Sequence, residues 1–217
     1  NVSRSDLPTG CASIWVDGQG ENSIVVYSGA NATAKADQVP QTQLASSELL
    51  LLQMEVAVEE NWKLLEKAKN QNVRTLLNLA PVGPVPVSAL LDLDYLVVNE
   101  IEAAALAKQH QISDDGEEAL ALVFASKFNL CCILTLGARG VIAAEGGQIF
   151  NMPAAEVTVV DTTAAGDSFI GGFAAAISKK WPLEKSLKFA TEVAGLTCTR
   201  LGAQSSIPYA AEIHTKL

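Results

Sequence analysis

Runs of apolar residues alternate with amphipathic stretches over most of this chain. Residues 49–53 form a continuous apolar run of strand length, and the apolar positions of residues 56–70 then recur with helical spacing. The same pair of patterns returns several times towards the C-terminus. It predicts strands at residues 49–53, 74–79, 95–98, 131–136 and 157–160, and helices at residues 56–70, 87–91, 102–109, 114–128, 165–180 and 183–201.

This alternation predicts an α/β fold over residues 47–217, with a mostly parallel sheet flanked by helices on both faces. The N-terminal part differs, because residues 12–16 and 23–27 flank Asp17-Gly18-Gln19-Gly20 and therefore predict a β-hairpin. A second hairpin is expected around Glu145-Gly146-Gly147. Parallel sheets bind ligands beyond the carboxyl ends of their strands. We therefore expect functional sites directly after Gln53, Leu79, Val98, Leu136 and Val160.

Two helices carry more detailed predictions. Ser113 is a candidate N-cap for the helix at residues 114–128. The core-facing side of that helix is expected to include Ala119, Leu122, Val123 and Phe124. Gly171 and Gly172 lie inside the helix at residues 165–180, where each glycine costs about 1 kcal/mol relative to Ala. Their presence predicts close packing at this point.

Composition narrows the class of protein. The chain has 217 residues, of which 49% are hydrophobic and 18% charged, so it can bury a sizeable core. Its 15 Lys and Arg against 24 Asp and Glu give a net charge of −9, which argues against nucleic-acid or membrane-surface partners. The four cysteines show no C-x-x-C spacing, as in a protein of the cytoplasm. No apolar run is long enough to span a bilayer.

The strongest chemical signal is the segment Asp161-Thr162-Thr163-Ala164-Ala165-Gly166-Asp167-Ser168-Phe169. It follows a predicted strand and opens a helix, so the free N–H groups of the first turn form a candidate phosphate site. Asp167 lies at the positive end of that helix, where it can hold a substrate hydroxyl in line with a phosphoryl donor. The alternative is that Asp161 and Asp167 are ordinary helix-start residues and Gly166 a tight turn.

Four segments, in order along the chain, resemble motifs of the ribokinase-like (PfkB) carbohydrate kinase family. The first is Asn99-Glu100-Ile101-Glu102, which is similar to the motif N-x-x-E, and the second is the turn Thr135-Leu136-Gly137-Ala138-Arg139-Gly140. Residues 161–167 resemble the signature D-T-x-G/A-A-G-D, and residues 200–206 resemble the C-terminal loop of the ribose-phosphorylating branch. The likeness extends from Thr9 to Pro208.

The resemblance implies an ATP-dependent sugar kinase that phosphorylates the 5-hydroxyl of D-ribose. Asp167 would be the catalytic base and contact the sugar, and the N–H groups of Ala164, Ala165 and Gly166 would form the anion hole. Glu55 would contact the sugar, although a buried structural carboxylate and an exposed helix-start residue are alternatives. The hairpin at residues 12–31 resembles a lid that covers the sugar and pairs with a second subunit in a homodimer.

The resemblance also implies sites for the nucleotide and for two cations. Glu102 would act on Mg²⁺ through water. Nucleotide contacts would come from Asn99, Thr135, Leu136, Gly137, Ala138, Arg139, Gly140, Gly166, Asp167 and Thr191. An activating K⁺ would be held by Asp161, Thr163, Thr197, Arg200, Gly202 and Ser206. The alternatives are a helix N-cap for residues 99–102, an ordinary hairpin turn for residues 135–140 and a plain C-terminal loop for residues 200–206.

Two departures from the family pattern bear on these expectations. Position 164 is Ala where the family most often has Gly, which narrows the freedom of the backbone at the anion hole. The family's N-terminal strands and a glycine-rich sugar-binding segment have no counterpart in the chain, which starts at Asn1. Residues 1–217 are therefore expected to be an incomplete kinase domain with a weak sugar site, and any targeting signal upstream stays open.

The alternatives to a ribose-phosphorylating enzyme are another sugar or nucleoside kinase of the family, or a truncated, non-catalytic form that binds nucleotide or dimerises.

Other chemistries find no support in the pattern. No G-x-x-x-x-G-K-[ST] loop occurs, which excludes P-loop chemistry. The two histidines, His110 and His214, have neither a metal-ligand spacing nor a G-x-S-x-G partner. A zinc enzyme and a serine hydrolase are therefore not expected.

Overall fold

The computed structural model describes residues 4–16 and 22–215. Its central six-stranded sheet follows the order of the chain, β3-β4-β5-β6-β7-β8. The first four strands are parallel, and β7 and β8 are antiparallel to their neighbours. The strands are β3 (Leu49–Leu52), β4 (Arg74–Asn78), β5 (Tyr95–Asn99), β6 (Cys131–Thr135), β7 (Val141–Glu145) and β8 (Gln148–Met152). The predicted mostly parallel sheet is confirmed.

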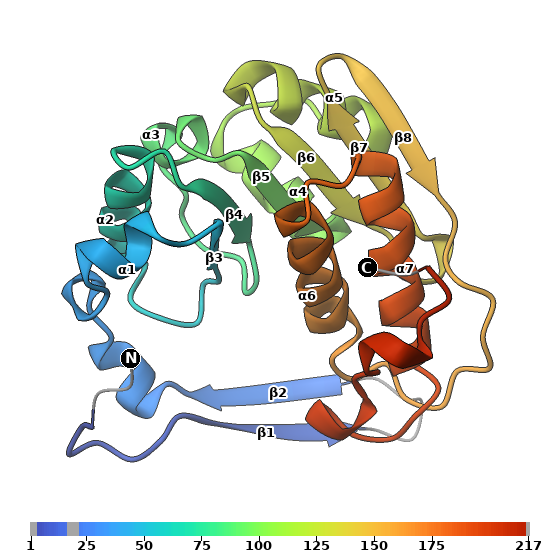
Figure 1. Cartoon of the computed structure of the whole chain (residues 1–217), viewed down its shortest axis with the longest axis horizontal. Helices are drawn as coiled ribbons and strands as arrows, with labels where there is room; N and C mark the ends of the chain where they lie inside the picture. Colours follow the sequence, from blue (N-terminus) through green and yellow to red (C-terminus); the bar gives the residue numbers. More distant parts are fainter. Residues whose placement is uncertain (1–3, 17–21, 216–217) are drawn as a thin grey trace.

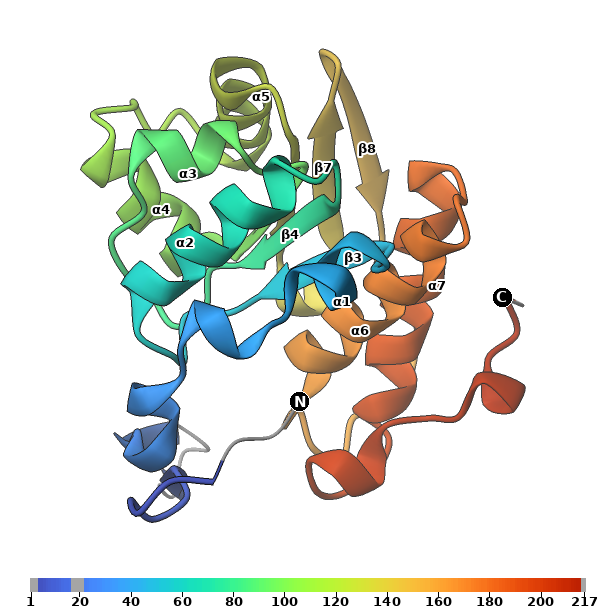
Figure 2. The same cartoon turned by 60° about the vertical axis from the view of Figure 1, so that its left-hand side comes forward.

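Helices cover both faces of this sheet, as predicted (Figures 1 and 2). One face carries α2 (Val58–Lys69), α3 (Val87–Leu91), α4 (Glu100–Gln109) and α5 (Glu117–Phe128), and the other carries α6 (Ala165–Ser178) and α7 (Leu183–Thr197). The short α1 (Gln41–Ala45) precedes β3. No helix in the described ranges combines the length and apolar character that a bilayer crossing requires.

The alternation of side chains along the strands builds one core on each face. On β6, Cys132 and Leu134 join the cluster under α2 to α5, whereas Cys131 and Ile133 join the cluster under α6 and α7. Phe173 of α6 is fully buried, and burial of such a side chain contributes roughly 1.5–3 kcal/mol. These two cores hold the carboxyl ends of the strands in fixed positions.

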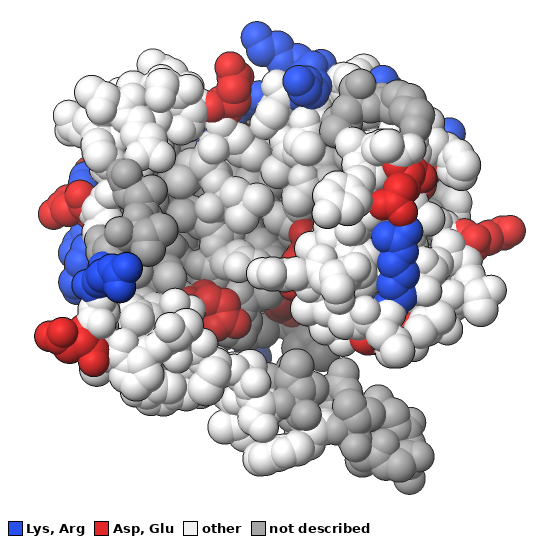
Figure 3. Space-filling model, turned by 60° about the horizontal axis from the view of Figure 1, so that its bottom comes forward, with Lys and Arg blue, Asp and Glu red and all other residues white. Residues whose placement is uncertain are grey.

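The predicted N-terminal hairpin is present as β1 (Cys11–Val16) and β2 (Asn22–Tyr27), which pair antiparallel from Cys11 opposite Tyr27 to Val16 opposite Asn22. The predicted turn at residues 17–20 lies outside the described residues. The hairpin extends beyond the carboxyl end of the sheet, away from the layered body (Figure 1). Figure 3 shows that the molecule is hollowed on this side and that acidic side chains border the hollow.

The predicted strand at residues 157–160 is wrong. These residues are irregular and pair with none of the described strands, and the amides of Val160 and Asp161 instead donate to the carbonyl of Cys198, at 2.8 and 3.2 Å. Val159 and Val160 are 60% and 53% exposed. Apolar β-branched residues produced the strand signal, but the segment runs beside the end of α7 rather than in the sheet. The segment at residues 161–169 therefore opens a helix, as predicted, but does not follow a strand.

Helix details also differ from the prediction. The N-cap of α5 is Gly116, at a φ of 102°, and not Ser113, because the Asp114 carboxylate accepts the Gly116 amide and closes a turn before the helix. Its buried residues are Leu120, Ala121, Phe124, Ala125 and Phe128, so only Phe124 of the predicted set is buried.

The two glycines of α6 behave differently. A Cβ on Gly172 would lie 3.1 Å from Val193 and 3.3 Å from Ala190, so the predicted close packing is confirmed there, against α7. Gly171 has open space around it, so the prediction is wrong at that residue. The helix α7 ends at Thr197, before the predicted end at residue 201.

Candidate active site

The start of α6 has the geometry of an anion site. Ala164 is the N-cap and adopts the left-handed conformation with a φ of 61°, after which the helix begins at Ala165. The anion hole is predicted to consist of three amides, those of Ala164, Ala165 and Gly166. The Ala165 amide already donates to the Thr162 carbonyl at 3.1 Å, so it is engaged within the protein. Gly166 is exposed, with open space where a side chain would lie. A ligand can therefore approach the backbone at Gly166.

Asp167 lies exposed in the first turn of α6. Its Oδ1 accepts a hydrogen bond of 3.2 Å from Nε2 of Gln53, which directly follows β3. The structure thus brings the first turn of α6 to the carboxyl end of the edge strand, where sites were expected.

Glu55 is exposed, which excludes the buried structural carboxylate, and it lies three positions before the first residue of α2, so it is not a helix-start residue either. It lines a cavity of about 590 Å³ with Val26 and Ser28 from the hairpin end and Met54 from the loop after β3. The Met54 amide donates to the Ala80 carbonyl at 3.0 Å, which joins this loop to the one after β4. The cavity therefore lies between the hairpin and the carboxyl end of the sheet.

Asp161 joins the two loops of the predicted K⁺ set. Its Oδ1 accepts the Thr163 amide at 2.9 Å and its Oδ2 accepts the Gly202 amide at 3.0 Å. These bonds, first that of Gly202, lower the pKa of the Asp161 carboxyl. The loop before α6 and the loop after α7 are thereby held against each other.

The remaining members of this set are arranged around that junction. Thr197 and Ser206 are fully buried, and the Ser206 hydroxyl donates to the Ala203 carbonyl at 2.6 Å. The Arg200 side chain forms an ion pair with Glu212. Within residues 4–16 and 22–215, no three His, Cys, Asp or Glu side chains gather as metal ligands. Carbonyl, hydroxyl and single carboxylate oxygens are donors of the kind that suits K⁺.

Asn99 and Glu102 form a reciprocal cap at the start of α4. The Glu102 amide donates to Asn99 Oδ1 at 2.8 Å, and the Asn99 amide donates to Glu102 Oε2 at 2.7 Å. Burial, with Glu102 only 7% exposed, raises the pKa of the Glu102 carboxyl. The N-cap interpretation of residues 99–102 is therefore confirmed. A carboxylate has further acceptor sites, so a contact to a hydrated Mg²⁺ remains compatible with the cap.

The turn at residues 135–140 lies beside this cap, because Thr135 of β6 is the register partner of Asn99 of β5. Leu136 and Gly140 are buried, whereas Gly137, Ala138 and Arg139 are exposed. A Cβ on Gly140 would lie 2.1 Å from the carbonyl oxygen of Met152, so the turn needs glycine there for packing. Two segments predicted to contact nucleotide thus lie side by side.

The Arg139 guanidinium is already bound by two carboxylates. It forms ion pairs of 2.5 Å with Glu100 at the start of α4 and of 2.6 Å with Glu117 at the start of α5. Thr191 of α7 is buried, and its hydroxyl has no hydrogen-bond partner. The Arg139 guanidinium is therefore held by acidic side chains, and the Thr191 hydroxyl lies inside the protein.

Gln53 is the residue that the sequence did not single out for a role. The pattern predicts it only as the last residue of the strand at residues 49–53. A polar side chain at the carboxyl end of an apolar strand is a signal that could have identified it. Its partner lies on α6, 114 positions away, and only the folded chain shows that contact.

Comparisons with known proteins agree with this geometry. Residues 2–210 match the sequence profile of the pfkB family carbohydrate kinases. Ribokinase from Staphylococcus aureus is 32% identical over 216 residues, which cover 98% of this chain and 71% of that protein. The structure of ribokinase from Thermotoga maritima has a TM-score of 0.87 and 37% identity, covering 95% of this chain and 68% of its own.

Arabidopsis thaliana ribokinase, whose structure is of a complex with ribose and ATP, has a TM-score of 0.81 at 28% identity and covers 94% of this chain and 67% of its own. The chain therefore spans about two thirds to seven tenths of these relatives. The profile match over almost its whole length, with the shared fold, shows that the chain belongs to the pfkB family of carbohydrate kinases, phosphotransferases with a hydroxyl acceptor.

Proposed function

We propose that this protein transfers the γ-phosphoryl group of ATP to the 5-hydroxyl of D-ribose. The observation that carries the proposal is the position of Asp167, exposed in the first turn of α6 and joined through Gln53 to the loop that bears Glu55. Similarity to proteins named ribokinase, one of them in complex with ribose and ATP, supports the choice of substrates.

In the proposed reaction Asp167 accepts the proton of the sugar hydroxyl, and the oxygen of that hydroxyl attacks the γ-phosphorus. The bond from that phosphorus to the β–γ bridging oxygen breaks, and ADP leaves. The positive end of α6 and the open Gly166 amide, with that of Ala164, stabilise the charge on the transferred group. Glu55 accepts hydrogen bonds from hydroxyls of the bound sugar at the cavity beneath the hairpin.

The nucleotide is proposed to lie along the starts of α4 and α6, against Asn99 and the turn at residues 135–140. Arg139 contributes to that turn by joining it to Glu100 and Glu117 rather than by direct pairing with phosphate. Glu102 would hold hydrated Mg²⁺, which supplies neutralisation of phosphate charge. The junction around Asp161 would hold K⁺ and order the loop before α6.

The hairpin is proposed as the lid of the sugar site and as the contact of a homodimer. Trp15, Val25 and Tyr27 are 61%, 55% and 52% exposed on this two-stranded sheet, which leaves apolar area for a second copy to cover. Residues 12–31 would then be the lid and residues 47–217 the body that binds nucleotide.

A single substitution tests the proposed base. Asp167→Asn should abolish transfer to ribose, a loss of about a thousandfold or more, because the proton acceptor is removed. It should leave ATP affinity, measured by calorimetry, within about twofold. Glu145→Gln, at the opposite end of the sheet, removes one negative charge as a control and should keep normal turnover. Wild-type turnover by Asp167→Asn would show that the base is misassigned.

The choice of acceptor needs a separate comparison. Turnover with ribose, fructose and adenosine should favour ribose. Equal or better use of adenosine or fructose would assign the protein to another branch of the family. Binding of ATP without turnover on any acceptor would favour a non-catalytic role.

A further inference from the structure

We propose that Gln53 is a positioning residue for Asp167, so that the loop after β3 orients the catalytic base. This inference rests on the proposed function, because it assigns a partner to the base. Its observation is a single hydrogen bond, of 3.2 Å, from Gln53 Nε2 to Asp167 Oδ1. That bond joins the edge strand of the sheet to the helix that carries the base.

The backbone of Gln53 is held independently of its side chain. Asn61 of α2, only 4% exposed, donates from Nδ2 to the Gln53 carbonyl at 2.6 Å. The neighbours Leu52 and Met54 are each 6% exposed and belong to the core under α2. The backbone from which the Gln53 side chain extends is therefore held in place. The hydrogen bond from its amide can then orient the Asp167 carboxylate.

The chemistry of an amide suits this position. An amide N–H donates to a carboxylate without adding charge, so it orients Asp167 while leaving it able to take a proton. A lysine at this distance would pair with the carboxylate as a full positive charge. The bond from Gln53 uses one acceptor site of Oδ1, so the carboxylate keeps others, among them those of Oδ2, for the sugar hydroxyl.

The same loop also carries Glu55, which lines the cavity beside the hairpin. Because Gln53 is bonded both to α2 and to α6, it ties the loop that carries Glu55 to the helix that carries Asp167. We therefore expect Gln53 to act on the geometry of phosphoryl transfer rather than on nucleotide binding.

The test replaces the donor while keeping the volume. Gln53→Met should lower kcat by about ten- to a hundredfold, since small misplacements of reacting groups have effects of this size. The KM for ATP and the calorimetric Kd for ATP should stay within about twofold. Gln148→Met, at the exposed first residue of β8 and at the opposite end of the sheet, is the matched control and should leave kcat unchanged.

A second variant guards against a folding defect. Gln53→Asn keeps the amide but shortens the side chain by one methylene, so it should also lower kcat, with an unfolding midpoint close to that of the wild type. Wild-type kcat in either folded variant would overturn the inference, and so would a loss of kcat matched by an equal loss of ATP affinity. If Asp167→Asn is inactive while Gln53→Met is fully active, the proposed function stands and only this inference fails.

Discussion

The backbone conformation of Ala164 is a feature of the site that the sequence alone does not show. The sequence indicates that Ala occupies a position where the family most often has Gly, but it does not show the backbone angle. The structure places Ala164 at a φ of 61°, a conformation that costs a residue with a Cβ about 1–2 kcal/mol. The strain lies at the N-cap of the helix that bears Asp167.

We predict that Ala164→Gly stabilises the protein. Removing the Cβ relieves the left-handed strain, and the gain, reduced by the greater freedom of glycine in the unfolded chain, should be about 1 kcal/mol. Ala165→Gly is the matched control, because Ala165 is the first residue of α6 and should lose about 0.5–1 kcal/mol. Urea denaturation measures both, and a change of the same sign in the two variants would contradict the prediction.

At the scale of elements, the start of α4 combines a structural and a proposed functional role. The Asn99 side chain caps the helix by accepting the Glu102 amide, and this alone explains why Asn stands at the position. The proposed function gives Asn99 a second role, a contact to nucleotide phosphate. The two roles place different demands on the side chain, so a substitution can separate them.

We predict that Asn99→Asp keeps the cap and weakens ATP binding. Aspartate caps helices as well as asparagine does, so the free energy of unfolding should change by less than about 0.5 kcal/mol. A carboxylate beside phosphate repels it, so the Kd for ATP should rise by about tenfold or more. Asn99→Ala, which removes the cap, should cost about 1 kcal/mol of stability. Unchanged ATP affinity in Asn99→Asp would leave Asn99 a purely structural residue.

Elements whose side chains alternate or repeat strongly were predicted well from the sequence. The strands β4 to β6 are buried on both faces, so their apolar runs are nearly continuous, and the hairpin β7 and β8 is set by its glycine turn. Residues 157–160 carry the same β-branched signal but lie outside the sheet, where no local pattern distinguishes them. The face of α5 was misplaced because its many alanines blur the helical period.

The site was predictable to the extent that it depends on local sequence. The first turn of α6 and the cap of α4 follow from residues close together in the chain. The contact between Gln53 and Asp167 and the junction of Asp161 with Gly202 join distant segments. Such contacts depend on how the sheet and helices assemble, and no single motif contains them.

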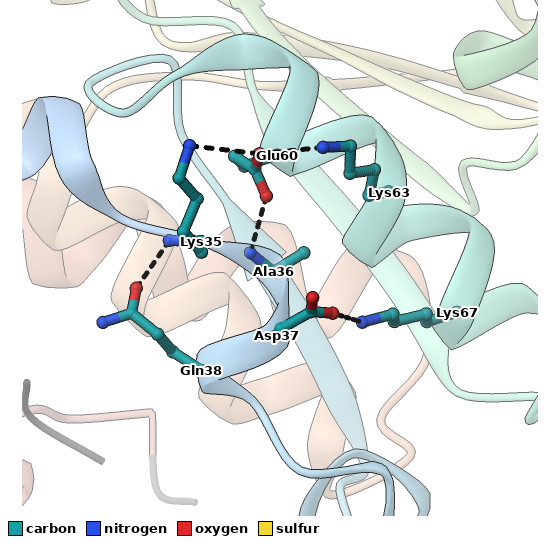
Figure 4. A network of polar contacts seen from close by, with 7 residues as sticks. All are labelled: Lys35, Ala36, Asp37, Gln38, Glu60, Lys63 and Lys67. Atoms are coloured by element: carbon teal, nitrogen blue, oxygen red, sulfur yellow. Dashed lines mark hydrogen bonds and ion pairs between the residues drawn. The ribbon is translucent and has the colours of Figure 1, made fainter.

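At the scale of the whole molecule, the hairpin must be attached to the body for it to cover a site. The hydrogen bonds of β1 and β2 run between the two strands, and the link to the body is the segment at residues 28–39. Glu60 of α2 fastens this segment, because its Oε2 accepts the Ala36 amide at 2.9 Å and its Oε1 pairs with Lys35 and Lys63 (Figure 4). Lys67 and Asp37 add a second link between the same elements.

This attachment should depend on pH. The Ala36 amide, followed by Lys63, lowers the pKa of the Glu60 carboxyl from 4.5 to about 2. Because the folded-state pKa is the lower one, the stability that Glu60 contributes is present above pH 4.5 and is lost as the pH falls towards 2. We predict that Glu60→Gln lowers the free energy of unfolding near pH 7 and that its difference from the wild type disappears by about pH 2. Chemical denaturation from pH 7 to pH 2 measures this difference. The control is Glu59→Gln, which removes the same charge at an exposed neighbouring position.

Hydrogen exchange at neutral pH gives a second test of the same contact. The Ala36 amide should lose protection in Glu60→Gln and keep it in Glu59→Gln. A stability difference that stays constant down to pH 2 would show that Glu60 does not act through its ionised carboxylate.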